Sequence, residues 1–506
     1  MNAVYDVLKH SLSAVGYHDC HHIHLTQSLA VVAKKIGVSS SDYDADSADY
    51  EKKIEIANTI RQATDDDAIL SRVAIANIRA IRLGHTSLTE EGLTRELESR
   101  PEHHPGPIQQ AAYVIRQLKR PEELDLLRQI YGKNFIQISI SLDKQSQITA
   151  LDQRTRVSHP GLSPDRRERR VDQLIRKDRQ QDDDPHGQRF SDAFHTGDVF
   201  LNGSSPESLR RGCNRFIRAL FGSNMISPTV DEMGAYFARG ASLRSVDLSR
   251  QVGAAILTDQ GDVVAVGCNE VPRPGGGTYW CSDPHPARDI DQNFEPNKAE
   301  TSRIIYDFVD AIRRAGFLDA GEAKGINKED ELVQFIVDSP KFQSEIRQAR
   351  ISDLTEFGRM CHAEMTALTD AARLGLSLKG TTIHVTTYPC HNCAKHLIAA
   401  GISRIVFIEP YPKSMALEFH QDALSVSPPH GEKVILEHFV GISPRRFEDV
   451  FSKKKRRDRE GRIKLWDAGV PHARTRTFTG SYTIDESLVL RHAFAKADER
   501  KYTRNE

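Results

Sequence analysis

One pattern near residue 362 constrains this chain more than any other. The run His-Ala-Glu begins at His362, and the run Cys-His-Asn-Cys begins at Cys390 and ends at Cys393. Imidazole and thiolate groups are the usual protein ligands of zinc, and a catalytic zinc takes three of them so that its fourth position stays open. Helix starts favour thiolate over thiol, because the positive end of the helix dipole stabilises the anion. We therefore predict that two helix starts meet here and that His362, Cys390 and Cys393 hold a zinc ion.

Glu364 stands two residues after the predicted histidine ligand. Since three ligands are already supplied, its carboxylate can act on a water molecule instead of the metal. We expect it to take a proton from the attacking water and to carry protons to the reacting ring and the leaving group, as general acid–base catalysis requires. The alternative is a structural zinc site, which takes four protein ligands. Cys361 or His391 could supply the fourth ligand, so both interpretations stay open at this point.

The composition sets the broad class of the protein. The chain has 506 residues, of which 39% are hydrophobic and 27% charged, and its formal net charge is −1. This length predicts two or three domains, and the charge gives no overall attraction to nucleic acid or to membranes. We find no uninterrupted apolar stretch of about 18 residues, so we expect no transmembrane helix. Seven cysteines without a secretion signal indicate a reducing compartment, and we expect a cytoplasmic protein.

The amino-terminal half gives weaker signals. Residues 1–130 are expected to be mainly helical, with 111–118 in a helix that continues toward residue 130. Apolar and polar residues alternate over 134–141, which predicts a strand. Residues 150–190 are highly charged and contain three prolines, which indicates a mobile segment or a lid. The arginines at 166–170 are interpreted first as a solvated helix face, because acidic residues are interleaved with them.

From about residue 226 the chain predicts strands that alternate with helices, which is typical of an α/β/α layered domain. A hairpin is expected over 253–267, with its turn at 259–262. A helical insertion is expected over 290–355. The other expected elements are helices over 364–374 and 390–400 and strands over 381–387, 404–409 and 433–439.

His-x-Glu combined with Pro-Cys-x-x-Cys is the signature of zinc-dependent nucleobase deaminases. Six stretches carry a closer likeness: Arg-Ser at 244–245, Ser-Arg-Gln-Val-Gly-Ala at 249–254, Gly-Cys-Asn-Glu-Val-Pro at 267–272, His-Ala-Glu at 362–364, Pro-Cys-His-Asn-Cys-Ala at 389–394 and Ile-Glu-Pro-Tyr-Pro-Lys-Ser at 408–414. Over 236–425 the chain resembles the deoxycytidylate deaminases. This resemblance implies that Asn269 binds the sugar hydroxyl and the base, and that Tyr411 packs near the nucleotide. It also implies phosphate contacts from Lys413 and Arg250, although Tyr411 and Lys413 could instead form a plain turn after a strand.

Further stretches extend the likeness over nearly the whole chain: AAYVIRQLKRPEEL at 111–124, GQRFSDAFHTGDVFLNGS at 187–204, LSRQVGAAI at 248–256 and IEPYPKS at 408–414. With them the chain is similar to the bacterial anti-phage dCTP deaminases. The resemblance implies a P-loop, nucleoside-kinase-like α/β domain over 1–225. It also implies a cytidine-deaminase-like α/β/α sandwich over 226–450, followed by a basic extension over 451–506.

The same resemblance implies a function. It predicts zinc-dependent conversion of dCTP, dCMP or both to the uracil nucleotide and ammonia, which would deplete dCTP and starve a replicating phage. It also implies a homo-oligomer, a hexamer in the deoxycytidylate deaminases, and activity held in check by a regulatory RNA or protein inhibitor.

One departure from the family is important. No Gly-x-x-x-x-Gly-Lys-Ser/Thr stretch is present, and the chain begins at what should be the helix after that loop. Without the loop amides and the lysine, triphosphate binding by the first domain has no physical basis. Either the start codon is assigned too late or the domain is only a scaffold. We therefore expect no kinase or ATPase activity from this chain as given.

Two other functions stay open. The same zinc chemistry serves deaminases that act on cytosine or adenine in RNA or single-stranded DNA, and a non-catalytic protein could keep zinc for structure. Aromatic residues make up 7% of the chain and the net charge is −1, which favours free nucleotides over a polynucleotide groove. The basic stretch at 453–464 is the feature that supports the polynucleotide alternative, and the presence of Glu364 speaks against the non-catalytic one.

Overall fold

The chain has a mixed α/β fold in two compact units, and we describe each by itself. One unit combines residues 1–229 with 440–506, and the other spans 230–439. In this computed structural model the described residues are 2–38, 50–86, 88–98, 106–179, 186–317, 329–347, 349–426, 433–453, 455–457, 459–463 and 482–490.

The described helices include none with both the length and the apolar character needed to cross a membrane.

The second unit is built on a six-stranded sheet with the strand order β6-β5-β7-β8-β10-β9. β5 runs antiparallel to β6 and β7, whereas β8 is parallel to β7 and β10, and β10 is also parallel to β9. The expected hairpin and the later strands are therefore confirmed. The strands are β5 (Gly253–Leu257), β6 (Val263–Cys268), β7 (Thr382–Thr387), β8 (Arg404–Glu409), β9 (Leu424–Ser425) and β10 (Val434–His438).

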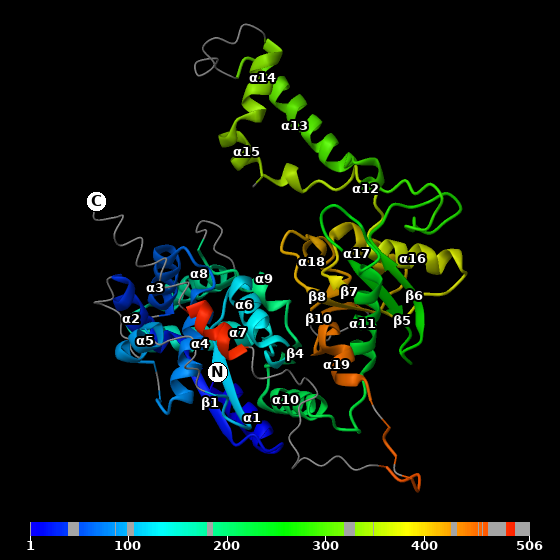
Figure 1. The fold of residues 1–506 in the computed structure, drawn as a ribbon. Helices are drawn as coiled ribbons and strands as arrows, with labels where there is room; N and C mark the ends of the chain where they lie inside the picture. Colours follow the sequence, from blue (N-terminus) through cyan, green and yellow to red (C-terminus); the bar gives the residue numbers. More distant parts are fainter. Residues whose placement is uncertain are drawn as a thin grey trace. The chain divides into compact units, whose positions relative to one another are not determined.

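Helices cover both faces of this sheet (Figure 1). Alternate residues of β5 point to opposite faces: Ala255 and Leu257 pack with α11, and Ala254 and Ile256 belong to the core under α16 and α17. The layered arrangement expected from the sequence is therefore present. The helices of the unit are α11 (Val230–Ser242), α12 (Asp289–Gln292), α13 (Pro296–Arg314), α14 (Glu329–Asp338), α15 (Pro340–Ile346), α16 (Ala363–Arg373), α17 (His391–Ala399) and α18 (Ala416–Phe419).

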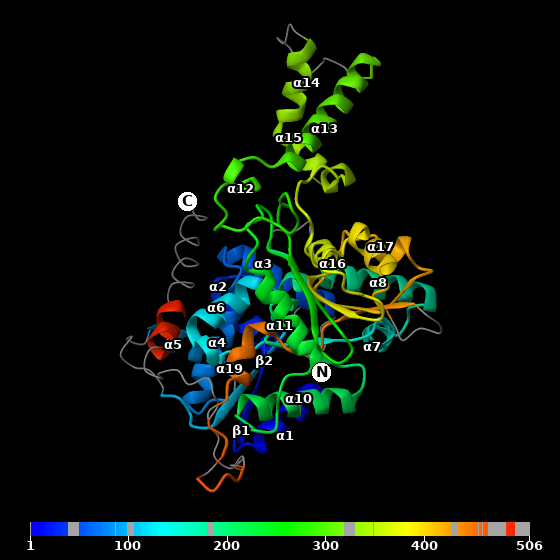
Figure 2. The ribbon, with the colours of Figure 1, turned by 90° about the vertical axis from the view of Figure 1, so that its right-hand side faces the viewer.

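The insertion between β6 and α16 is helical, as expected, and its long helices α13 and α14 lie side by side beyond the sheet (Figure 2). Ile305 and Val309 are buried on the inner face of α13. Phe308, by contrast, is 60% exposed. A helix advances 100° per residue, so Phe308 is turned away from the stripe through Ile305 and Val309 that packs on α14.

The first unit contains two separate sheets, one with the order β1-β2 and one with the order β11-β4-β3. β1 is parallel to β2, β3 is parallel to β4, and the short β11 is antiparallel to β4. The strands are β1 (Asp19–His24), β2 (Ala111–Arg116), β3 (Ile138–Ser141), β4 (Val199–Asn202) and β11 (Gly441–Ile442). The helices are α1 (Asn2–Ser13), α2 (Leu25–Ile36), α3 (Tyr50–Thr64), α4 (Ile69–Arg82), α5 (Glu90–Glu98), α6 (Pro121–Tyr131), α7 (Lys144–Ser158), α8 (Pro164–Arg179), α9 (Phe190–Phe194), α10 (Pro206–Leu220), α19 (Phe447–Phe451) and a helix at 482–490.

Two expectations for this unit are corrected. The predicted helix over 111–118 is wrong, because 111–116 form the strand β2. In a short run of mostly apolar residues, the spacing of apolar and polar positions cannot distinguish a buried strand from a buried helix. Residues 150–190 are helical in α7 and α8 over most of their length, although 180–185 lie outside the described residues.

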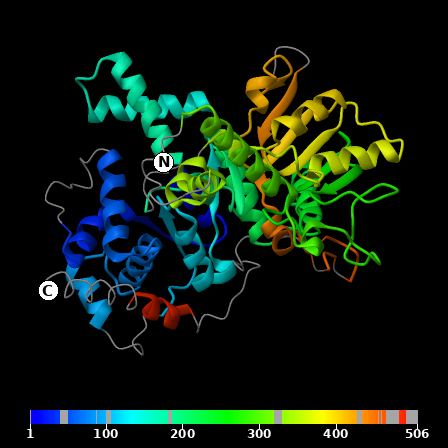
Figure 3. The ribbon, with the colours of Figure 1, turned by 90° about the horizontal axis from the view of Figure 1, so that it is seen from above.

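The helix at 482–490 belongs to the core of the first unit (Figure 3, red). Tyr482 and Leu490 are buried in the same cluster as helices α2 and α4. Glu486 accepts hydrogen bonds from Arg82 at 2.8 Å and from the Tyr131 hydroxyl at 2.8 Å. The described part of 451–506 therefore includes a packed helix as well as basic residues. Whether this unit is nucleoside-kinase-like stays a prediction.

A glycine pair in α11 allows a test of the layered packing. A Cβ on Gly234 would lie 2.3 Å from the buried ring of His384 in β7, whereas one on Gly240, in the same helix, would meet nothing within 4 Å. We expect Gly234→Ala to destabilise the second unit by about 1–3 kcal/mol through overpacking. Gly240→Ala, the matched control, should be neutral or stabilising by up to about 1 kcal/mol. Hydrogen exchange at β5 and β7 measures both, and equal effects would contradict the packing.

Candidate active site

The histidine of the predicted zinc site caps the amino-terminal end of α16. His362 is the N-cap residue, with extended backbone angles, and helix α16 follows directly. The residue before it, Cys361, exchanges two backbone hydrogen bonds of 3.1 and 3.2 Å with Glu270, just after β6. A Cβ on Gly267 in β6 would lie 2.3 Å from the Ala363 carbonyl oxygen. Glycine at that position therefore lets the helix start lie directly on the sheet.

The two cysteines lie at the second helix start. Cys390 is the N-cap of α17, and its sulfur accepts a hydrogen bond of 3.4 Å from the backbone amide of Cys393. Ser414, after β8, donates a hydrogen bond of 2.7 Å to the carbonyl of Pro389 and so fixes the approach to α17. The predicted meeting of two helix starts is thus present.

The ligand atoms of the three residues converge. His362 Nδ1 lies 3.4 Å from Cys390 Sγ and 3.3 Å from Cys393 Sγ, and all three atoms lie within 4.8 Å of one another. Within the described part of the chain, this is the one group of three or more residues with metal-ligating geometry. It does not include Cys361 or His391, whose ring packs edge-on against Phe419 at 5.7 Å. One imidazole and two thiols are a donor set suited to zinc, and three donors leave one coordination position open.

The protonation states of the three residues are coupled. A hydrogen bond from Cys393 and one from His362 lower the pKa of the Cys390 thiol to about 4. The hydrogen bond to Cys390 raises the pKa of His362 to about 9, and the one between the two cysteines, with burial, raises the pKa of Cys393 well above its usual value. At neutral pH the protein without metal therefore holds one thiolate, one thiol and one imidazolium at this point.

Glu364 lies in the first turn of α16, beside these donors. Its side chain is buried, with 4% of the residue exposed, and burial raises the pKa of its carboxyl while the charge on His362 lowers it. It also interacts with the thiol of Cys393. A buried carboxylate whose pKa is raised is suited to accept and return protons near neutral pH. The position is therefore the one expected for a proton carrier that is not a metal ligand.

Asn269 and Arg250, two predicted substrate contacts, are tied to the protein itself. The Asn269 side chain accepts a hydrogen bond of 2.7 Å from the Val252 amide and donates one of 2.8 Å to the Arg250 carbonyl. An amide has further donor and acceptor capacity, so a contact to the sugar stays a prediction. The Arg250 guanidinium pairs with Glu409 at 3.0 Å, and its role as a phosphate contact also stays a prediction.

Tyr411 and Lys413 lie in the turn that follows β8. The Ser414 amide donates a hydrogen bond of 3.0 Å to the Tyr411 carbonyl, which closes the turn, and the Ser414 hydroxyl holds the turn to Pro389. Lys413 is exposed and Tyr411 is half-buried. The turn therefore adjoins the residue before Cys390, although the roles of the two side chains stay predictions.

Sequence reasoning assigned no role to three groups near the site. Asp247 raises the pKa of His362 through its charge, and its carboxylate accepts hydrogen bonds from the amides of Ser249 and Arg250. Glu270 is buried, and its carboxylate accepts a hydrogen bond of 2.9 Å from its neighbour Val271. The Arg244 guanidinium lies 3.7 Å from the centre of the Trp280 ring. Arg244 and Glu270 lie in two of the stretches that resemble the deoxycytidylate deaminases, and that resemblance could have pointed to both residues.

The pKa shifts predict how zinc binds. Zinc needs a neutral imidazole and two thiolates, so at pH 7 its binding should release about two protons, one from His362 and one from Cys393. Zinc affinity should therefore fall in acid and rise with pH, most steeply below the pKa of His362, and it should keep rising above that pKa because Cys393 still holds its proton there. Isothermal titration calorimetry of chelator-treated protein, in buffers of different ionisation enthalpy, measures the proton count.

Two variants control this measurement. Cys393→Ser should lose tight zinc binding, whereas Cys361→Ser should keep one zinc per chain, because Cys361 lies outside the converging group. Zinc binding with no proton release, or zinc loss in Cys361→Ser, would contradict the assigned ligand set.

Comparison with known proteins gives a family for this region. A family model described as the cytidine and deoxycytidylate deaminase zinc-binding region matches residues 237–409. The chain is 45% identical to the deoxycytidylate deaminase of Enterobacteria phage T2 over 53 residues. This stretch covers 10% of this chain and 28% of that protein. It is also 27% identical to the deoxycytidylate deaminase of Mus musculus over 99 residues, a stretch that covers 20% of this chain and 48% of that protein. The chain thus spans less than half the length of these curated relatives.

The dCMP deaminase from the cyanophage S-TIM5, in its apo form, is 16% identical with a TM-score of 0.22, and the match covers 42% of this chain and 100% of that one. The region matched by the family model contains His362, Glu364, Cys390 and Cys393. Residues 237–409 of this chain are therefore a zinc-binding region of the cytidine and deoxycytidylate deaminase family.

Proposed function

We propose that this chain catalyses the zinc-dependent hydrolytic deamination of deoxycytidine nucleotides, converting dCTP, dCMP or both to the uracil nucleotide and ammonia. The observation that carries the proposal is the buried carboxylate of Glu364 beside three converging ligand atoms. A structural zinc site would need a fourth protein ligand and would not need a buried carboxylate with a raised pKa beside it. The matched family region and the deoxycytidylate deaminase relatives support the same activity.

In this mechanism His362, Cys390 and Cys393 hold the zinc ion. When bound, zinc would lower the pKa of a water molecule from about 16 to near 7 and offset the negative charge that develops on the pyrimidine ring. Glu364 accepts one proton of the attacking water and delivers it to N3 of the ring. It then takes the remaining proton of the added hydroxyl and passes it to the amino group, so that the carbon–nitrogen bond breaks, ammonia leaves and the ring carbonyl forms. Its burial keeps competing solvent away from these transfers and keeps its pKa high enough to return the proton.

Free nucleotides are the proposed substrates in preference to nucleic acid. Aromatic residues make up 7% of the chain and its formal net charge is −1, which favours free nucleotides over a polynucleotide groove. The dCTP preference, a role in anti-phage defence by nucleotide depletion, a hexameric assembly and a regulatory RNA or protein inhibitor come from the resemblance and are proposals of the same kind. Lys413 and Arg250 are the proposed phosphate contacts, and Asn269 and Tyr411 the proposed contacts to the nucleoside.

Removal of the proton carrier should separate catalysis from metal binding. We expect Glu364→Gln to keep one zinc per chain and to lower the turnover number by about 10²–10⁴-fold, because general acid–base help is lost while the ligands remain. Asp370→Asn, in the same helix, is the matched control. Asp370 pairs with Arg373 on the surface at 3.1 Å, so turnover should stay within about twofold. Near-full turnover in Glu364→Gln would exclude Glu364 as the proton carrier.

A substrate panel should separate the nucleotide and polynucleotide functions. Ammonia release from dCTP, dCMP, CTP and a cytosine-containing single-stranded oligonucleotide, measured with zinc-loaded protein, gives four kcat/KM values. We expect dCTP or dCMP to exceed the oligonucleotide by at least about 10²-fold, because the deoxynucleotide would be recognised through its own phosphates and sugar. A larger kcat/KM for the oligonucleotide would reject the proposed substrate class.

A further inference from the structure

The chain reaches the first zinc ligand through a segment with little backbone support. Residues 354–360 form neither helix nor strand, and Cys361 makes one isolated bridge, to Glu270. Within the described part of the chain, the backbone amides of 354–360 donate no hydrogen bond to the sheet. His362 follows directly, with α16 behind it. The position of this ligand therefore depends on what holds the segment on its amino-terminal side.

Arg359 ties this segment to the base of the helical insertion. Its guanidinium donates hydrogen bonds to the Ala287 carbonyl at 2.8 Å, the Asp289 carboxylate at 3.0 Å and the Gln292 side chain at 2.8 Å. These acceptors belong to α12 and its approach, where the insertion meets the sheet (Figure 1). A guanidinium presents its donors in a rigid fork, so three acceptors fix both its place and its orientation.

Asn297 holds the same segment at a point further from the site. Its side chain, in the first turn of α13, donates a hydrogen bond of 2.7 Å to the Leu354 carbonyl and accepts one of 3.3 Å from the Phe357 amide. Both sets of contacts come from residues 287–297. The segment that leads to His362 is therefore held on the insertion, and it meets the sheet only at Cys361.

The charged partner of Arg359 is buried near the metal site. Asp289 is 5% exposed, and the Arg359 side chain is 33% exposed. Burial raises the pKa of the Asp289 carboxyl, the charge of Arg359 lowers it, and the charge of Asp247 raises it. The charge of Asp247 also acts on His362. One carboxylate thus interacts with both Asp289 and the zinc ligand, so the Arg359 contacts lie beside the site.

We propose that Arg359 is a positioning residue for the zinc site, which holds the segment before His362 on α12 and so keeps the imidazole where it meets the two sulfurs. Arg359 acts through the chain between itself and His362, in the way that groups around a metal site orient the ligands themselves. The helical insertion thereby becomes part of the machinery of the site. This inference rests on the proposed zinc-dependent function, but its first test needs neither zinc nor substrate.

The first test uses the full chain after treatment with a chelator. The Cys361 amide donates a hydrogen bond of 3.1 Å to the Glu270 carbonyl, so its hydrogen exchange measures whether the segment stays in place. We expect Arg359→Met to speed this exchange by at least about tenfold, with exchange in β7 unchanged, because the contacts that resist local opening are lost. Arg359→Lys keeps a charge beside Asp289 and should stay within about threefold of the original chain. Equal exchange in Arg359→Met and the original chain would overturn the proposal.

The second test measures zinc affinity by competition with a chelator. Arg359→Met should bind zinc about 10–100-fold more weakly, the usual effect of removing a group that orients a ligand. Arg313→Met is the matched control, because Arg313 pairs with Asp310 at 2.7 Å within α13 of the same insertion. It should bind zinc as the original chain does. Unchanged zinc affinity in Arg359→Met, or an equal loss in Arg313→Met, would overturn the assigned role.

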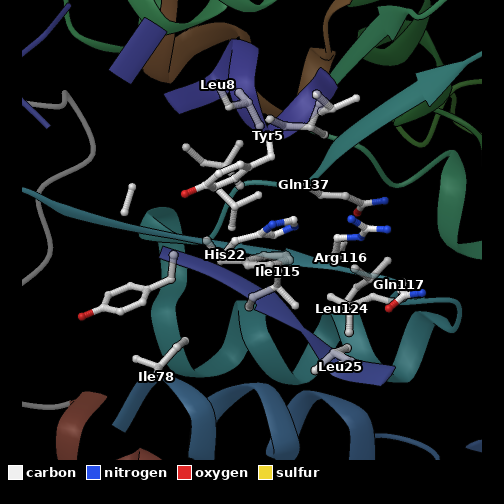
Figure 4. Close-up of a pocket in the computed structure, with 18 of the residues that line it drawn as sticks. Tyr5, Leu8, His22, Leu25, Ile78, Ile115, Arg116, Gln117, Leu124 and Gln137 are labelled. Atoms are coloured by element: carbon white, nitrogen blue, oxygen red, sulfur yellow. The ribbon is translucent and has the colours of Figure 1, made fainter. Parts of the chain in front are cut away.

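A further control separates positioning from a general loss of stability. Leu124 lines a cavity of about 740 Å³ in the first unit, between α1 and α6 (Figure 4). Leu124→Ala should destabilise that unit, because a buried side chain is shortened, and should leave zinc affinity unchanged. If Leu124→Ala weakened zinc binding as much as Arg359→Met, the effect would be one of stability and the proposal would fail.

Turnover distinguishes this inference from the proposed function. In zinc-loaded protein, Arg359→Met should lower kcat for dCTP or dCMP by about tenfold and leave KM within about threefold, because the position of the metal changes and the contacts to the nucleotide do not. If the original chain releases no ammonia, the proposed function fails, and the exchange and zinc measurements still decide the role of Arg359. A raised KM with an unchanged kcat would assign Arg359 to substrate binding and overturn the positioning role.

Discussion

The close approach of α16 to β6 sets the geometry of the deaminase region. Gly267 brings the sheet so near to the helix that a single added carbon would clash with the Ala363 carbonyl. The residue before Ala363 is His362, and the backbone pair between Cys361 and Glu270 holds the chain on the other side of that histidine. The imidazole is therefore positioned by backbone contacts, which are stiffer than contacts between long side chains. The sulfurs of α17 then need only the first turn of their own helix to reach it.

The sequence predicted this unit well because its signals are local. The helix starts at His362 and Cys390 follow from residue types and spacing, and the turn of the β5-β6 hairpin lies between two apolar runs. The first unit was harder. β1, with the sequence Asp-Cys-His-His-Ile-His, has no strand pattern, and its pairing with β2 depends on residues about 90 positions away. The sequence of β2 predicted a helix, because apolar and polar residues do not alternate along it and all six residues are half-buried.

The candidate site shows the same division between local and distant information. The three ligand residues and Glu364 could be predicted because the chemistry fixes their types and spacing. The role of Asn269 in holding the backbone at Arg250 and Val252 could not, since it depends on how the ends of β5 and β6 meet. The charge of Asp247 on His362 is likewise a product of the fold, because 115 positions separate the two residues in the sequence.

The division of the chain into two units also determines which unit is fully synthesised first. Residues 230–439 are inserted into a unit whose core needs both the segment before them and the segment after them. Ile442 packs in one cluster of that core, and Tyr482 and Leu490 pack in another. During synthesis, the ribosome therefore finishes the whole zinc-binding region before the first unit has all of its core residues. The inserted region can thus fold on the growing chain before the helix at 482–490 has been synthesised.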